Sequence, residues 1–235
     1  MRRRRIVKAA ALGGITLPLA GCTNRSAEGN GDAGENDGNS TESDGNGAGT
    51  EQEADESNGA DRQEFSGNGS KAVDGVSIDG GLVIVDAAHE GAGDFQVRLV
   101  PGDDEASELF ADSSGAYAGQ TARHVDGGTY QLSVVAGGDW EVTVGQPRPT
   151  SGERPPISLS GSGNEVRGPF EFDGTHRPSG DHGGERISVN ILSPTGDARA
   201  FVFHEDSIDN PPAFEYEGIG YIEIKSDGEW SVEIE

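Results

Sequence analysis

The histidines and the single cysteine are the side chains whose chemistry is easiest to recognise in this sequence. The 235 residues include five His, one Cys and one Met. The densest group of metal-ligating residues is His176, Asp181, His182 and Glu185, in a Gly-rich stretch. Zinc ligands do cluster on such loops, but no second pair at a suitable spacing completes a site. We therefore interpret this stretch as a solvated loop.

Other catalytic or metal-binding motifs are excluded because the required residues are missing or wrongly spaced. A blue-copper centre needs a Cys thiolate, two His and usually a Met, whereas the only Cys is Cys22 and the only Met is Met1. His89-Glu90 and His204-Glu205 lack the second His of a zinc-protease motif, and no nucleophile elbow or Walker loop occurs. We expect no catalytic residue and no metal or other cofactor, and therefore a non-enzymatic protein.

The neighbours of Cys22 indicate its chemistry. Leu19-Ala20-Gly21-Cys22 ends a short apolar run and matches a lipobox, in which the Cys receives a lipid. Arg2 to Arg5 with Lys8 form the charged region of a signal peptide, and Ala9 to Leu19 form its apolar region. This apolar region is about half the roughly 20 residues that a spanning helix needs. We predict a signal peptide over residues 1–22 and a membrane anchor through lipid on Cys22.

The arginines before the apolar region indicate the export route. Arg3-Arg4-Arg5-Ile6-Val7-Lys8 resembles a twin-arginine export signal, with Arg3 and Arg4 as its arginines. A general secretory signal with additional arginines is the alternative. Both routes place the anchored chain on the outer face of the cytoplasmic membrane.

The composition is strongly acidic. The chain has 42 acidic and 17 basic residues, for a formal net charge of −25 at pH 7. Nucleic-acid binding is excluded because it needs clustered cations. Salt screens the self-repulsion of such a surface, so low Lys content with abundant Asp and Glu resembles the proteins of halophilic archaea. An acidic surface protein from a mesophile is the alternative.

Residues 23–64 have the composition of a stalk. Gly, Asn, Ser, Asp and Glu dominate, and the segment lacks aromatic residues. It cannot bury enough apolar area to offset its conformational entropy, so we predict disorder. Candidate N-glycosylation sequons occur at Asn24, Asn39 and Asn68, which the sequence places in or beside this stalk.

The remainder of the chain contains an internal repeat. Its best match keeps every spacing of one strand pair: Leu132, Val134, Gly138, Trp140, Val142 and Val144 recur as Ile222, Ile224, Gly228, Trp230, Val232 and Ile234. Upstream, Phe65 to Gly69 match Leu159 to Gly163, and Val76 to Gly80 match Phe170 to Gly174. We predict two domains, over residues 65–147 and 159–235, joined by a stiff Pro-rich linker over residues 148–158.

Within each repeat the apolar residues alternate with polar ones, which predicts half-buried strands. Gly137-Gly138 and Asp227-Gly228 have the composition of hairpin turns with positive φ. Glu105 to Ala111 is the nearest candidate for a helix and fits a loop equally well. The fold class is therefore all-β, with two tandem small antiparallel β-sandwich-like domains from an internal duplication. Trp140 and Trp230 lie on the apolar face, which predicts core packing.

The first repeat contains four short motifs, namely His89-Glu90-Gly91-Ala92-Gly93-Asp94-Phe95, Gly115-Ala116-Tyr117-Ala118-Gly119, Gly128-Thr129-Tyr130 and Gly138-Asp139-Trp140-Glu141-Val142. Together they resemble a β repeat of uncharacterised haloarchaeal surface lipoproteins. The second repeat departs from this pattern, because it lacks the Gly-x-Tyr-x-Gly element and has His182-Gly183-Gly184 where His-x-Gly falls. The resemblance implies a cell-surface location and a β fold, and it implies no catalytic residue.

These observations favour a lipid-anchored protein that binds or scaffolds something outside the cell. Surface-layer glycoprotein, polysaccharide or another exported protein are the candidate partners. The alternative is a carbohydrate- or solute-binding accessory lipoprotein, for which exposed Trp140 or Trp230 would be the deciding sign.

Overall fold

The structure, a computed structural model, describes residues 61–102 and 106–235. The predicted lipid site Cys22, the export arginines Arg3 and Arg4, and the sequons at Asn24 and Asn39 lie outside these residues. Within them, every regular element is a β-strand except one short 3-10 helix. No helix in this part of the chain is long and apolar enough to cross a membrane. The all-β prediction is confirmed.

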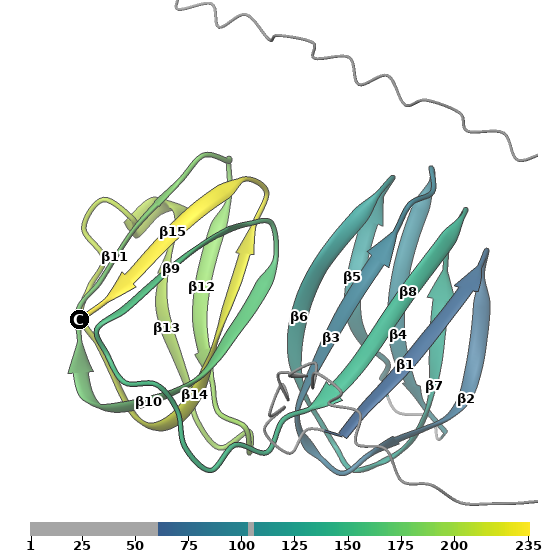
Figure 1. Ribbon diagram of the computed structural model, residues 1–235, viewed down its shortest axis with the longest axis horizontal. Coiled ribbons are helices and arrows are strands. Elements are labelled where there is room, and N and C mark those ends of the chain that lie inside the picture. Colours follow the sequence, from purple (N-terminus) through teal and green to yellow (C-terminus); the bar gives the residue numbers. More distant parts are fainter. Residues whose placement is uncertain (1–60, 103–105) are drawn as a thin grey trace, which may run out of the picture. The chain divides into compact units, whose positions relative to one another are not determined.

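Strands β1 to β8, drawn in blue and teal in Figure 1, form two antiparallel sheets that we call the first sandwich. The sheet orders are β1-β8-β3-β6 and β2-β7-β4-β5. The strands are β1 Asp61–Asn68, β2 Lys71–Ile78, β3 Gly81–His89, β4 Asp94–Pro101, β5 Glu108–Ser114, β6 Tyr117–Val125, β7 Gly128–Val135 and β8 Asp139–Gln146. Their inner faces enclose one core, which includes Phe95, Leu99, Leu132 and Trp140.

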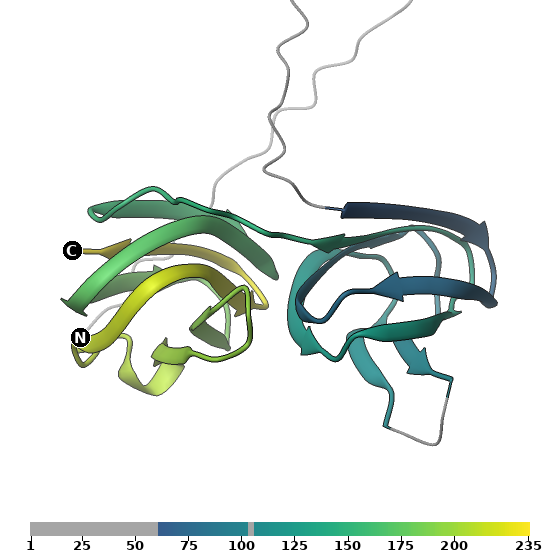
Figure 2. The same cartoon turned by 90° about the horizontal axis from the view of Figure 1, so that it is seen from below.

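Strands β9 to β15 form the second sandwich, in green and yellow in Figure 1. Its sheets have the orders β10-β14-β12-β13 and β11-β15-β9, and Figure 2 shows their curved strands from below. The elements are β9 Ile157–Ser162, β10 Glu165–His176, β11 Pro178–His182, β12 Ile187–Leu192, β13 Arg199–His204, η1 Glu205–Ser207, β14 Phe214–Ser226 and β15 Glu229–Ile234. Phe172, Phe203, Ile222 and Trp230 belong to its separate core.

Strand boundaries follow the period-two patterns with a few differences. The candidate helix at Glu105 to Ala111 is not a helix in its described part, because Glu108 opens β5. The first strand begins at Asp61 rather than Phe65, so residues 61–64 lie in β1 and not in the predicted stalk. Asn68 consequently lies in β1, where its amide donates to Asp139 Oδ1 at 2.7 Å.

Irregularities in the sheets recur at positions that the sequence repeat makes equivalent. The ladder between β2 and β7 shifts between Val73 and Val76, and that between β10 and β14 shifts between Arg167 and Phe170. The β4–β5 ladder shifts after Val97, and the β12–β13 ladder shifts after Val189. Such bulges are features of a particular fold rather than defects. They agree with the repeat, while the duplication itself stays a prediction.

The two sandwiches differ at one strand. The Gly-x-Tyr-x-Gly element of the first repeat forms the turn before β6 and the start of β6, which begins at Tyr117. In the second sandwich the described chain passes from β13 through η1 directly to β14. The second sandwich, which lacks the Gly-x-Tyr-x-Gly motif, therefore also lacks a counterpart of β6. As a result, β11 lies at the edge of its sheet. Pro178 opens this edge strand, which limits further pairing because Pro has no N–H.

Both tryptophans are buried, as predicted. Trp140 is 2% exposed and Trp230 is 4% exposed. Each indole N–H donates to a turn carbonyl, that of Gly69 at 2.8 Å and that of Gly163 at 3.0 Å. Each ring also packs over a glycine of the neighbouring strand, where a Cβ would lie 2.6 Å from the ring. The deciding sign for carbohydrate binding through tryptophan is therefore absent at both positions.

The turns at Gly137-Gly138 and Asp227-Gly228 join the expected strands, but the prediction of positive φ is wrong for their glycines. Close contacts explain these glycines instead. A Cβ on Gly138 would lie 2.8 Å from Gly91 Cα, and a Cβ on Gly228 would lie 2.6 Å from Gly184 N. The loop after β3 or β11 thus packs directly against the hairpin turn.

The Pro-rich segment that the sequence predicts as a stiff linker packs against the second sandwich. Glu153 pairs with Phe170 in an isolated bridge, and its N–H donates to Pro169 O at 3.1 Å. A Cβ on Gly152 would lie 2.6 Å from Phe170 C. The segment therefore runs along β10, and β9 begins at Ile157 rather than Leu159.

Candidate functional site

The candidate metal ligands of the second repeat do not converge. His176 is 5% exposed, and its Nε2 accepts the Asp173 N–H at 3.4 Å within an aromatic cluster with Phe172 and Phe214. Asp181 is exposed at the far end of β11. Among the described residues, no three His, Cys, Asp or Glu side chains are grouped to hold a metal ion.

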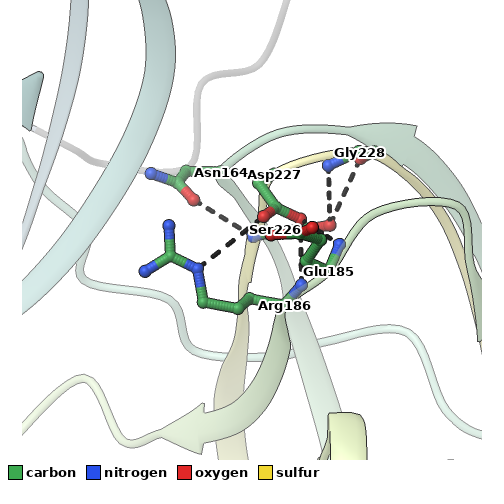
Figure 3. A network of polar contacts seen from close by, with 6 residues as sticks. All are labelled: Asn164, Glu185, Arg186, Ser226, Asp227 and Gly228. Carbon is green, nitrogen blue, oxygen red and sulfur yellow. Dashed lines mark hydrogen bonds and ion pairs between the residues drawn. The ribbon is translucent and has the colours of Figure 1, made fainter. Parts of the chain in front are cut away.

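The loop that contains Glu185 is held by a carboxylate in the β14–β15 turn (Figure 3). Asp227 Oδ1 accepts the backbone N–H groups of Glu185 at 2.9 Å and Arg186 at 3.0 Å. The backbone bond from Arg186 is the main reason that the pKa of Asp227 is lowered. On the neighbouring turn, Asn164 Oδ1 accepts the Ser226 N–H at 3.2 Å. This network joins three loops and has a structural role.

Two histidines occupy matching places beside the tryptophans. His89 is opposite Trp140 and His182 is opposite Trp230 in their ladders. His89 Nδ1 lies 3.0 Å from Gly115 O, and its ring stacks on Phe95 at a centroid distance of 4.7 Å. Neither His89 Nε2 nor His182 Nδ1 has a hydrogen-bond partner. His89 Nε2 instead packs against Gly91, so we assign it a packing role.

A small apolar cluster joins the two sandwiches. It contains Leu82 and Ala122 from the first sandwich and Leu192 and Tyr221 from the second, all at most 6% exposed. Burial raises the pKa of Tyr221 to about 12, so the phenol is neutral at physiological pH. The sandwiches therefore share a desolvated contact.

Hydrogen bonds surround this cluster and cover the edge of β6. Gln120 N donates to Asn164 O at 2.8 Å, and the Gln120 side chain accepts the Val166 N–H at 3.2 Å. At the other end, Leu82 N donates to Pro194 O at 2.9 Å. An edge strand carries unpaired backbone groups, and here Asn164 of the second sandwich satisfies the Gln120 N–H of β6.

Glu223 is the least expected member of this contact. Its side chain is 2% exposed, although it occupies the outward position between Ile222 and Ile224 on β14. Glu223 Oε1 accepts the Ala122 N–H at 3.1 Å and lies 3.1 Å from Lys225 Nζ. The carboxylate therefore satisfies a β6 edge group and is compensated by a cation. Alternation alone assigns a residue at this position to solvent.

The most distinctive exposed surface is on the sheet β10-β14-β12-β13. We call it the Phe201 face and define it by the outward side chains of Ser188, Arg199, Phe201, His204 and Lys225. Phe201 is 47% exposed, one of two large hydrophobic side chains exposed in the described chain. Its ring contacts that of His204 at a centroid distance of 5.4 Å.

The polar groups of the Phe201 face are held in place by a buried amide on the same side of the sheet. Asn190 is 4% exposed and lies opposite Phe201 in the β12–β13 ladder. Its Oδ1 accepts a hydrogen bond from Arg199 at 3.1 Å, and its Nδ2 donates to Ser188 Oγ at 3.2 Å. A buried amide thus orients a guanidinium and a hydroxyl beside an exposed aromatic ring. Exposed aromatic and Arg side chains are typical of binding surfaces.

Sequence reasoning did not single out this face. His204-Glu205 was considered only as a fragment of a zinc-protease motif. The sequence pattern that indicates this face is Arg199-Ala200-Phe201. Because Ala200 is buried, Phe201 lies on the same outward side of the strand as the charged Arg199.

Other surfaces offer less distinctive chemistry. Glu90, Asp139 and Glu141 line a shallow hollow on the outer face of β1, β8 and β3. None of these carboxylates makes an ion pair with a described residue. In a chain with a net charge of −25, such a face is an ordinary solvated surface.

Comparisons with known proteins add no functional assignment. No protein-family model matches the chain, and no curated protein matches it. Among solved structures, it is similar to a conserved protein of unknown function from Pseudomonas aeruginosa PAO1. The two share 12% sequence identity over 75% of this chain and 79% of that one, with a TM-score of 0.26. The functional argument therefore depends on the geometry described above.

Proposed function

We propose that this chain is an exported, lipid-anchored, non-enzymatic protein whose β-sandwiches bind a ligand outside the cell. The anchor is proposed at Cys22, and Arg3 and Arg4 are proposed to direct export. The acidic stalk would extend the sandwiches from the outer face of the cytoplasmic membrane. The acidic, Lys-poor composition supports a halophilic archaeal source.

The observation that supports a binding role best is the Phe201 face. It combines an exposed aromatic ring with a guanidinium oriented by a buried amide. It lies on a sheet whose far end is fixed to the first sandwich through Leu192 and Tyr221. A side chain held on a rigid sheet loses little entropy on binding, which favours affinity.

The anchor is tested by fractionating cells that express the full chain. We expect the wild type in the membrane fraction, sensitive to protease added to intact cells, and Cys22→Ser in the medium. Thr23→Ser is the control, because it leaves the cysteine in place. Retention of Cys22→Ser in the membrane, or protease resistance of the wild type on intact cells, would contradict the proposed location.

Binding is tested with the released Cys22→Ser chain and isolated envelopes of the cells that make the protein. We expect Phe201→Ala to reduce envelope retention at least fivefold. Val135→Ala is the matched control, since Val135 is 43% exposed on a strand of the first sandwich. Equal retention of all three chains would contradict a role for the Phe201 face, and turnover of a substrate by the purified chain would contradict a non-enzymatic function.

A further inference from the structure

We infer that the Phe201 face binds a saccharide chain that carries carboxylate groups, such as a uronate polysaccharide. This inference rests on the proposed binding function and assigns a ligand class to the same face. It is carried by two exposed rings, an oriented guanidinium and a second cation on one sheet face.

The rings supply the apolar part of the site. Phe201 and His204 present two rings inclined by 51° to one another. The face of an aromatic ring carries partial negative charge and attracts polarised C–H groups. A pyranose presents several such C–H groups on one side, so an exposed ring of this kind suits a sugar. The partial exposure of Phe201 leaves ring area available to a ligand.

The cations distinguish an acidic sugar from a neutral one. Arg199 makes no ion pair with a described residue, and its hydrogen bond to Asn190 uses one guanidinium nitrogen. An Arg side chain recognises a carboxylate through two parallel hydrogen bonds. The guanidinium is therefore oriented and still has donors for a carboxylate ligand.

Lys225 provides a second cation on the same face. Its side chain is 35% exposed, and its Nζ lies 3.1 Å from Glu223, whose side chain is 2% exposed. Asp206 lies at the other side of the face, 3.9 Å from His204 Nδ1. Glu223 balances the charge of Lys225, so Arg199 is the cation of this face that has no carboxylate partner among the described residues. An exposed guanidinium without a carboxylate partner is complementary to an anionic ligand.

The equivalent face of the first sandwich keeps a guanidinium, because Arg98 occupies the register position of Asn190, but it differs at the other positions and provides an internal comparison. By the repeat register, Leu109 replaces Phe201, Asp112 replaces His204 and Val135 replaces Lys225. Asp112 there accepts a hydrogen bond from Gln96 at 3.1 Å. A face with a carboxylate in place of the imidazole is not suited to a uronate, so binding is assigned to the second sandwich alone.

The test is calorimetric titration of the Cys22→Ser chain with tetragalacturonate, with maltotetraose as a neutral sugar and a polyglutamate peptide as an acidic polymer that is not a sugar. We expect tetragalacturonate to bind and maltotetraose to bind at least tenfold more weakly. Phe201→Ala and Arg199→Gln should each weaken tetragalacturonate binding about tenfold, whereas Val135→Ala should leave it unchanged. Raising the salt concentration should weaken binding because charge is involved.

The outcomes separate the ligand class from the proposed function. Equal binding of maltotetraose, or full affinity in both variants with unchanged unfolding midpoints, overturns the acidic-saccharide inference. Stronger binding of polyglutamate that both variants lose overturns it in favour of an acidic protein partner. If no probe binds while envelope retention still requires Phe201, only the ligand class is wrong. If envelope retention is also independent of Phe201, the proposed function fails as well.

Discussion

Removing the buried carboxylate of Glu223 should weaken the contact between the sandwiches more than its single charge suggests. In Glu223→Ala, the Ala122 N–H loses its acceptor at the covered edge of β6. Lys225 loses its partner too, but its side chain is 35% exposed and can be hydrated. The orphaned backbone N–H is therefore the larger loss.

The expected magnitude follows from these two contributions. A buried N–H without a partner costs about 1–3 kcal/mol. The truncated methylene of Glu223 adds about 1 kcal/mol, because the position is almost fully buried. We expect Glu223→Ala to lower the free energy of unfolding by about 2–4 kcal/mol. Glu223→Gln keeps an acceptor for Ala122 and should cost about 1 kcal/mol.

The assay is urea unfolding of the full chain at fixed pH and salt, followed by tryptophan fluorescence. Glu171→Ala is the control, because its ion pair with Arg154 at 2.6 Å is solvent-exposed and should contribute less than about 1 kcal/mol. Equal destabilisation by Glu223→Ala and Glu223→Gln would refute the argument, since the acceptor would then be irrelevant. A cost for Glu223→Ala no larger than that of Glu171→Ala would refute it as well.

Three further predictions concern the loops and the cores. Gly91→Ala places a Cβ against the His89 imidazole and should lower the thermal midpoint, whereas a substitution that leaves it unchanged would contradict the packing role. Trp140→Phe removes an indole N–H bond of 2.8 Å to the β1–β2 turn and should cost about 1–3 kcal/mol in urea unfolding. The pKa of Asp227 is lowered, chiefly by the Arg186 backbone N–H, so its carboxylate stabilises the fold above its ordinary pKa and loses this effect as pH falls through the folded value. The stability difference between wild type and Asp227→Ala should therefore be largest near neutral pH and shrink in acid, as measured by unfolding across pH.

Much of the fold could be predicted from the sequence because strands that pack on a core alternate apolar and polar residues. The alternation through Trp140, Val142 and Val144 predicted a half-buried strand, and β8 has that burial pattern. The two tryptophans in one register predicted equivalent positions, and both indoles donate to matching turns. These features are local, since they depend on which face of a strand meets its own core.

The contact between the sandwiches could not be predicted in this way. Ile84 and Glu223 are outward residues of their strands, and periodicity alone assigns them to solvent. Their burial depends on a second layer that no local pattern specifies. The glycines at Gly138 and Gly228 were placed correctly in turns, but the physical reason is close approach of another loop rather than positive φ. The Phe201 face was missed because the alternation in a strand indicates which of its side chains point outward. It does not indicate which outward side chains of neighbouring strands lie next to one another.

The residues of the contact between the sandwiches are not repeated at the equivalent positions of each sandwich. The contact joins unlike faces, with Ile84 on β3 in the first sandwich and Leu192 and Tyr221 in the second. When two similar units touch through different faces, each unit has one face that is not used in the contact. Such a contact can add further units at these unused faces unless their residues differ from those in the contact. In the repeat register Tyr221 corresponds to Gln131, and Ile84 corresponds to Arg177, so both free faces are polar at positions that are apolar in the contact. The sequence thus stabilises one contact and disfavours its repetition.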